Sequence, residues 1–336
     1  MDPLSQGTVG AAFAQSTANK DNLLKIGVIG FLAGLAPDLD VLIQSSTDPI
    51  LFLEYHRQFT HSLFFIPFGS LIVALLIFPL VKRSMNFKTV YLASLLGYAT
   101  HGLLDACTSY GTQLFWPFSN ERVTWNNISI IDPLFTIPVL ILLGIAIKSK
   151  KKVFSFFAIG WITFYLSLGF VQYERALSAA IELANSRGHN AERLTLKPSF
   201  GNLILWKSIY QHNETFYVDA IRTVQSSTWC LGESITAFDY QQHLPDLDED
   251  SQQKKDIERF RWFSQDYLGY DEEKNIVTDV RYSMIPNQID PMWGLVIDDQ
   301  LGINEHAIWW TSRSLDQSQL DLFTDMLKGK ECETSY

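Results

Sequence analysis

Two long apolar stretches in the first half of the chain contain no charged residue: SLFFIPFGSLIVALLIFPLV at 62–81 and VFSFFAIGWITFYLSLGFV at 153–171. Each is close to the ~20 apolar residues that a helix needs to span a bilayer. Three further stretches, at 23–43, 89–106 and 128–147, carry acids or histidines near one end. Pro37 interrupts the first of these three, which also suits a re-entrant or interfacial segment. The pattern predicts an α-helical membrane bundle of about five membrane segments within residues 1–171.

From residue 172 onward the pattern changes to that of a soluble domain. The runs NETFYVDAIRTV (213–224) and NIVTDVRYSMI (275–285) alternate between apolar and polar residues, which is typical of half-buried strands. QYERALSAAIELANSRG (172–188) predicts a helix that ends at a glycine. We therefore expect residues 172–336 to form a soluble α+β domain.

The amino-acid composition agrees with a membrane part followed by a soluble domain, and it argues against nucleic acid as a partner. Hydrophobic residues make up 47% of the 336 residues, and charged residues only 18%. The net charge of −10 argues against a basic surface for nucleic acid, so no nucleic-acid partner is predicted. The three cysteines lie far apart without CxxC spacing, so neither a thiolate metal site nor a dense disulfide framework is expected. The N-terminus does not resemble a cleavable signal peptide.

Basic residues in two short loops predict the orientation in the membrane. Lys82, Arg83 and Lys88 lie between the second and third segments, and four lysines at 148–152 lie between the fourth and fifth. The positive-inside rule places both loops in the cytoplasm. We therefore expect a multi-pass protein of the inner (plasma) membrane with an extracytoplasmic, periplasmic C-terminal domain. This threading gathers the ionisable residues of the membrane half at the outer ends of their segments: Asp38, Asp40, His56, His61, His101, Asp105 and Asp132.

Ionisable residues at membrane depth usually face a bundle interior or a wet cavity, so each is a functional candidate. His101 and Asp105 in ATHGLLDA are four residues apart, which places both on one helix face. There they can share a metal ion or form a hydrogen-bonded pair. In PDLD, Asp38 and Asp40 follow a helix-breaking proline, and in an extended chain both would point to the same side as an oxygen-rich metal site. A polar cap at a helix end is the alternative for this pair.

The stretch YHRQFTHSLFF places two histidines and an arginine before a spanning segment. His56 and His61 are five residues apart, so both can serve one site only if His56 lies in a loop and His61 in the first helical turn. Thr60 and Ser62 are then candidates for helix capping and for hydrogen bonds to the ligands. Arg57 is a candidate for binding an anionic group such as a phosphate. Interfacial anchoring of the helix is the alternative for the whole stretch.

Together these motifs supply the mixed nitrogen and oxygen ligands of a hydrolytic metal site. We expect a divalent metal, zinc in the first place, with manganese or magnesium as alternatives. Its predicted ligands are Asp38, Asp40, His56, His61, His101 and Asp105.

Five segments in order over about residues 1–145 resemble the YdjM family, whose members are assigned as membrane-bound metal-dependent hydrolases: MDPL, GLAPDLD, HRQFTHS, GYATHGLLDACTSYGTQLFWPFS and IIDPLFT. KPSFGNLILWK and DVRYS in the later half resemble an extended branch of the family. The family is regarded as distantly similar to zinc-dependent phospholipase C and P1-type nucleases. The resemblance implies ligands among the six residues above, with Asp132 as a further candidate. Many members have a Thr-His pair where this chain has Ser5 and Gln6, which implies fewer metal ions or a reorganised site.

The resulting hypothesis is a membrane-bound, phosphoesterase-like hydrolase acting on a small-molecule or lipid phosphoester at the outer face of the bilayer. Asp40 or Asp132 would accept a proton from water, and Arg57 would neutralise charge in the transition state. The aromatic stretch at 113–125 would line the entrance or form an interfacial belt. One alternative is a metal-binding or proton- and ion-handling membrane protein without hydrolysis, which is disfavoured because the two uncharged spans offer no relay. The other is a membrane-anchored interaction module.

Overall fold

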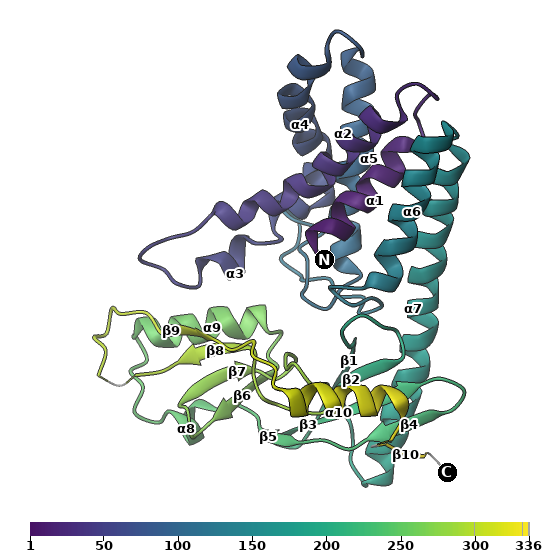
Figure 1. The fold of residues 1–336 in the computed structure, drawn as a ribbon. Coiled ribbons are helices and arrows are strands. Elements are labelled where there is room, and N and C mark those ends of the chain that lie inside the picture. Colours follow the sequence, from purple (N-terminus) through teal and green to yellow (C-terminus); the bar gives the residue numbers. More distant parts are fainter. Residues whose placement is uncertain (299, 331, 335–336) are drawn as a thin grey trace. The chain divides into compact units, whose positions relative to one another are not determined.

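The computed structural model describes residues 1–298, 300–330 and 332–334, and the chain divides into two compact units (Figure 1). The first unit comprises Met1–Ile43, Tyr55–Val171 and Phe200–Asn202. The second comprises Gln44–Glu54, Gln172–Ser199 and Leu203–Tyr336. Residues 44–54, which the sequence analysis includes in the membrane domain, thus belong to the second unit.

The first unit is helical. Its helices are α1 (Pro3–Gln15), α2 (Leu23–Leu35), α4 (Ile66–Val81), α5 (Phe87–Ala106), α6 (Pro133–Ser149) and the first part of α7 (Val153–Ser186), with the short 3₁₀ helices η1 (Ala36–Leu42), η2 (Phe59–His61) and η3 (Leu63–Phe65). Side-chain caps fix several starts, because the first N–H groups of a helix have no partner within it. The Asp2 carboxylate accepts from the Ser5 N–H at the start of α1, and the Asn86 amide oxygen accepts from the Thr89 N–H at the start of α5.

Two helical stretches in the described part of the chain are long and apolar enough to cross a membrane. They are Leu63–Val81 and Val153–Ser186, whose first part is the apolar one. They correspond to the two uncharged predicted segments. Of the other three, α2 has only 13 residues, α6 has 17, and α5 has 20 but is less apolar. The five predicted segments are therefore supported at two positions.

Three helices of the first unit cross in close contact at glycines. A Cβ atom at Gly97 of α5 would overlap the carbonyl oxygen of Gly30 of α2, and one at Gly10 of α1 would overlap the same oxygen. Small residues let helix backbones approach in this way. The crossing brings the C-terminal end of α2 against the middle of α5.

The second unit is built on two antiparallel sheets. The first has the order β1-β2-β3-β4-β10, with β5 paired to β3, and the second has the order β6-β7-β8-β9. The strands are β1 (Glu192–Pro198), β2 (Leu205–His212), β3 (Thr215–Thr223), β4 (Ser227–Cys230), β5 (Ser234–Thr236), β6 (Leu268–Asp271), β7 (Ile276–Asp279), β8 (Trp293–Val296), β9 (Ile308–Thr311) and β10 (Glu333–Thr334). The helices are α3 (Leu51–Tyr55), whose last residue falls in the first unit, the second part of α7, α8 (Tyr240–His243), α9 (Gln252–Phe263) and α10 (Gln317–Lys328). Both predicted strands are present, although the second ends at Asp279.

Helices cover both faces of the first sheet of this unit (Figure 1). On one face, Met326 and its neighbours in α10 pack on Leu205 and Ala220. On the other face, Trp206 contacts Tyr173 of α7, and the Trp229 indole N–H donates to the carbonyl oxygen of Ala179. Adjacent strand residues such as Leu205 and Trp206 point to opposite faces, so both faces of β2 are buried.

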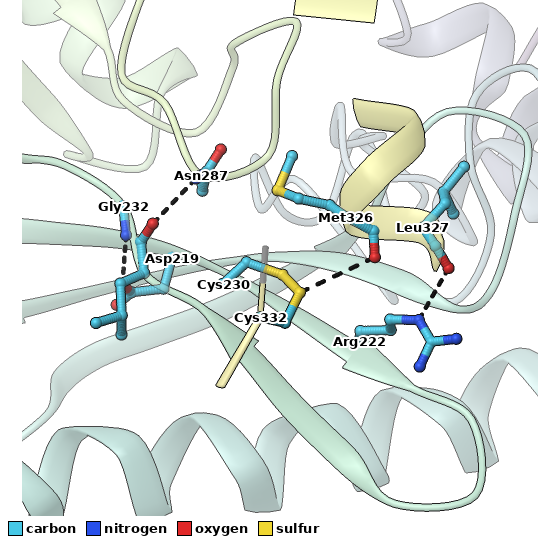
Figure 2. The surroundings of a disulfide bond; sticks show 9 residues. Asp219, Arg222, Cys230, Gly232, Asn287, Met326, Leu327 and Cys332 are labelled. Carbon is cyan, nitrogen blue, oxygen red and sulfur yellow. Dashed lines mark hydrogen bonds between the residues drawn. A yellow bond between two sulfur atoms is a disulfide. The ribbon is translucent and has the colours of Figure 1, made fainter. Parts of the chain in front are cut away.

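A disulfide joins Cys230 of β4 to Cys332, 102 residues later (Figure 2). Nearby, the Arg222 guanidinium donates to the carbonyl oxygen of Leu327, so the end of α10 is held at the same edge of the sheet. Sequence spacing did not reveal this bond, because the sheet brings together cysteines that are distant along the chain. Cys107 is free and buried.

The glycine crossing gives a stability prediction with a matched control. Gly97→Ala should destabilise the detergent-solubilised protein by about 1–3 kcal/mol, because the added methyl group overlaps the Gly30 carbonyl. Gly160→Ala should be neutral or stabilising by up to about 1 kcal/mol, because nothing lies within 4 Å of its Cβ position and alanine favours the helix. Thermal unfolding checks the difference, and equal melting temperatures for the two variants would contradict the close crossing.

Candidate metal centre

Four ligand atoms from three elements of the first unit converge on one point. The Nε2 atom of His61 lies 2.9 Å from Nε2 of His101, 3.4 Å from Oδ1 of Asp38 and 3.2 Å from Oδ2 of Asp105. The Nε2 atom of His101 lies 3.3 Å from the same Asp38 oxygen and 3.5 Å from the same Asp105 oxygen. Tetrahedral zinc with bonds of about 2.0–2.1 Å holds its ligand atoms about 3.3 Å apart. These separations lie around that value, so the four residues fit a divalent metal ion.

The helical elements supply these ligands in different ways. His101 and Asp105 lie one turn apart on α5, as the i, i+4 spacing predicts. His61 ends η2, and Gly102 of α5 leaves room for its carbonyl oxygen, which a Cβ atom would overlap. Asp38 lies on η1, which follows α2 directly at Pro37.

The segment PDLD corrects one expectation. It forms a 3₁₀ helix instead of an extended strand, so residues two apart point to different sides. Asp38 accordingly faces His61 and His101, whereas Asp40 faces His56 and the backbone of Arg57. The two carboxylates therefore make different contacts, although both belong to a second group of possible ligands with His56.

Hydrogen bonds to the Nδ1 atoms orient both imidazoles toward the centre. The Nδ1 atom of His101 lies 2.5 Å from the carbonyl oxygen of Gly34, so it is the N–H donor and Nε2 carries the lone pair. The Nδ1 atom of His61 lies 3.2 Å from Oδ2 of Asp40 and 3.0 Å from the Thr60 hydroxyl. Two Nε2 lone pairs 2.9 Å apart repel each other unless a proton or a metal ion lies between them.

Asp40 holds the loop that carries the histidines. It is buried and accepts from the Arg57 backbone N–H at 3.0 Å and from the Thr60 hydroxyl at 2.8 Å. Its other oxygen lies 2.7 Å from Nδ1 of His56. Arg57 has a left-handed backbone conformation, with φ of 65°, which turns its N–H toward this carboxylate.

A second group of possible ligands consists of Asp38, Asp40 and His56. Asp38 therefore belongs to both groups, and its side chain is 24% exposed, whereas those of His61, His101 and Asp105 are fully buried. Burial lowers the pKa of His56, more than the adjacent Asp40 raises it. The neutral imidazole that results is the form that binds metal ions.

Asp105 is the most deeply buried carboxylate of the centre. Its Oδ1 atom accepts from the Gln6 side-chain amide at 2.9 Å and also pairs with the α-amino group of Met1. Its Oδ2 atom lies 3.2 Å from Nε of Arg57. Arg57 is itself buried, donates to the Thr108 hydroxyl at 3.1 Å and lies over the Tyr110 ring. The guanidinium that the sequence analysis assigns to substrate thus contacts a predicted ligand.

The carboxylates of the centre act strongly on the charge of His61. Burial lowers the pKa of His61, but hydrogen bonds to Asp105, Asp38 and Asp40 outweigh this effect and raise the pKa to about 10. The carboxylates therefore favour a cation at this position, either a proton on His61 or a metal ion. Metal binding at such a site displaces the proton.

Asp132 does not belong to either ligand group among the described residues. It caps α6 instead: Oδ1 accepts from the N–H groups of Leu134 and Phe135, and Oδ2 accepts from the Tyr165 hydroxyl at 2.7 Å. These contacts explain its place at the end of an apolar segment.

Sequence reasoning missed three supporting residues. Gln6 stands where many family members have a histidine, and its side-chain amide donates to Asp105. Tyr98 lies one turn before His101, and its hydroxyl donates to the carbonyl oxygen of Thr60 at 2.8 Å. Thr108 contacts Arg57. Only Tyr98 had a usable signal, because it shares the helix face of the HxxxD pair.

The family match covers nearly all of the first unit of the chain and part of the second. The family described as YdjM inner membrane protein matches residues 1–176, slightly more than half of the chain. The uncharacterised protein YfhP of Bacillus subtilis (strain 168) is 32% identical over 119 residues, which cover 35% of this chain and 36% of that protein. The chain therefore matches only about a third of the length of this relative. No solved structure matches, and the distant similarity to phospholipase C and P1-type nucleases stays a prediction. The match over residues 1–176 shows that this chain belongs to the YdjM inner membrane protein family.

Proposed function

We propose that this protein is a membrane-bound, metal-dependent hydrolase of phosphoesters, with a small-molecule or lipid phosphoester as substrate. The observation that supports the proposal is the spacing of four buried or half-buried ligand atoms at the distances of a tetrahedral metal site. Asp38, His61, His101 and Asp105 would hold the ion, zinc in the first place. A bound divalent metal acidifies water and polarises a phosphoryl oxygen.

The surrounding residues would fix this centre. Asp40 orients His61 through Nδ1, and Arg57 together with Gln6 orients Asp105. Asp40 already accepts several hydrogen bonds and Asp132 caps α6, so we assign both to structural support instead of proton transfer from water. Asp38 is the ligand that is partly exposed to solvent, so we propose that water and substrate reach the centre from its side.

We propose that the centre and the second unit both lie at the outer face of the inner (plasma) membrane. The lysine-rich loops at 82–88 and 148–152 support a cytoplasmic position for the opposite ends of the helices. The Cys230–Cys332 disulfide supports an extracytoplasmic second unit, because disulfides persist in oxidising compartments. This topology retains five membrane segments, three of which are shorter or more polar than a typical span.

Metal content and hydrolysis test the function together. Purified protein should contain about one or more equivalents of zinc or manganese and should hydrolyse bis-p-nitrophenyl phosphate or a phospholipid. The His101→Ala, Asp105→Ala double variant should lose both properties, because it removes two of four ligands. His212→Ala, in the second unit, should retain both.

Elemental analysis and phosphate-ester assays on the same preparations give the readouts. Metal binding without hydrolysis of any tested ester would favour the metal- or ion-handling alternative. Folded wild-type protein that takes up neither metal would refute the site itself.

Asp40→Ala separates orientation of the ligands from ligation. It should weaken zinc affinity by about 10–100-fold while leaving the stoichiometry unchanged, because residues that orient metal-binding histidines have effects of this size. Competition with a chromogenic chelator measures the affinity. Complete loss of bound zinc would instead show that Asp40 is a ligand.

Accessibility of single cysteines tests the topology. Ser46→Cys lies in an exposed loop after η1, and Ser84→Cys lies in the exposed lysine-rich loop between α4 and α5. A membrane-impermeant maleimide should label Ser46→Cys in cells with a permeabilised outer envelope, and should label Ser84→Cys only after the inner membrane is opened. The reverse pattern would place the centre on the cytoplasmic side.

A further inference from the structure

Two lysines, Lys207 buried and Lys197 half-buried, lie side by side on the first sheet of the second unit. Lys197 of β1 and Lys207 of β2 are direct partners in the antiparallel register. The same row continues with Ala220 of β3 and Cys230 of β4, so both lysines point to the sheet face that α10 covers. Lys207 is only 4% exposed.

A segment that follows β7 covers both amines. The Lys197 ammonium donates to the carbonyl oxygen of Arg281 at 2.6 Å and lies 3.1 Å from the centre of the Tyr282 ring. The Lys207 ammonium donates to the Ser283 hydroxyl at 2.7 Å and to the carbonyl oxygen of Gln288 at 2.8 Å. The sequence stretches KPSFGNLILWK and DVRYS, distant along the chain, therefore meet at one place.

The ammonium groups of Lys197 and Lys207 are not paired with carboxylates. Neither lysine has a carboxylate oxygen within ion-pair distance in the described part of the chain. The nearby Asp279 carboxylate pairs with Arg281 at 2.7 Å, and the Glu233 carboxylate accepts from the Ile289 N–H at 2.8 Å.

Such an arrangement is unfavourable without compensation. Like charges directly opposite on neighbouring strands repel each other, and a buried charge without a counterion is costly. Burial lowers the pKa of Lys207 to about 7 and lowers the pKa of Lys197 as well. An anion would stabilise the charged form of both side chains.

We propose that Lys197 and Lys207 form a binding site for a phosphate group. An ammonium has three N–H donors, and Lys207 uses two of them within the protein, so it keeps one for a ligand. Lys197 donates one hydrogen bond to the backbone and contacts a ring with its cationic head. Two ammonium groups match the two negative charges and several acceptor oxygens of a phosphate. This site is independent of the proposed hydrolytic function and involves no residue of the metal centre.

Binding of inorganic phosphate to the full-length protein tests the site. The protein is first stripped of metal with a chelator, so that phosphate cannot bind through an ion in the first unit. Calorimetry at constant ionic strength should show about one equivalent of saturable phosphate binding, and phosphate should raise the melting temperature above that in chloride. Lys197→Met and Lys207→Met should each weaken binding by at least about tenfold. Lys255→Met, at an exposed position of α9, should leave it unchanged.

The source of the phosphate is decided by competition with short-chain phosphatidic acid, which displaces inorganic phosphate if the site takes a lipid headgroup and does not if it takes the free ion. Lys197→Arg keeps the charge and provides a variant that tests the site if the methionine variants do not fold. Absence of saturable binding to the wild-type protein would overturn the proposal and leave two lysines that only fasten the covering segment. Equal binding by wild type and by a folded methionine variant would overturn it as well.

Discussion

The candidate metal centre depends on the close crossing of α2 and α5. The backbones of these helices meet at Gly30 and Gly97, and a side chain at Gly97 would overlap the Gly30 backbone and force the two helices apart. One turn further along, the carbonyl oxygen of Gly34 reaches Nδ1 of His101. Because α2 continues directly into η1, the same crossing also sets the position of Asp38. A contact between backbones thus fixes two of the four ligand atoms.

The charges around His61 and His101 favour binding of a cation at the centre. Three carboxylates surround His61 and His101 in a region with little solvent, and hydrogen bonds fix the direction of each imidazole. Buried carboxylates are unfavourable unless they are paired or bind a metal. Arg57 and the α-amino group of Met1 neutralise part of the charge on Asp105, and a divalent ion would neutralise the rest. In the second unit, the positive charges of Lys197 and Lys207 are unfavourable for the same reason, and there an anion would compensate them.

The second unit is held together by different contacts. Its main sheet is buried on both faces, and the Cys230–Cys332 disulfide connects β4 to the end of the chain. The buried Asp279–Arg281 pair and the two lysines hold the segment after β7 against the sheet. The comparison with known families reaches only residue 176, so this unit has to be understood from its own contacts.

The sequence by itself determined the features that depend on local periodicity. The uncharged runs at 62–81 and 153–171 are long enough to predict spans, and an i, i+4 spacing places His101 and Asp105 on one face wherever the helix lies. The tertiary structure decided the rest, because contacts between distant segments are not encoded in local spacing. It folded the segment with Asp38 and Asp40 into a 3₁₀ helix, which gives the two carboxylates different contacts, and it directed Arg57 to Asp105. It also used Asp132 as a helix cap and joined two cysteines 102 residues apart.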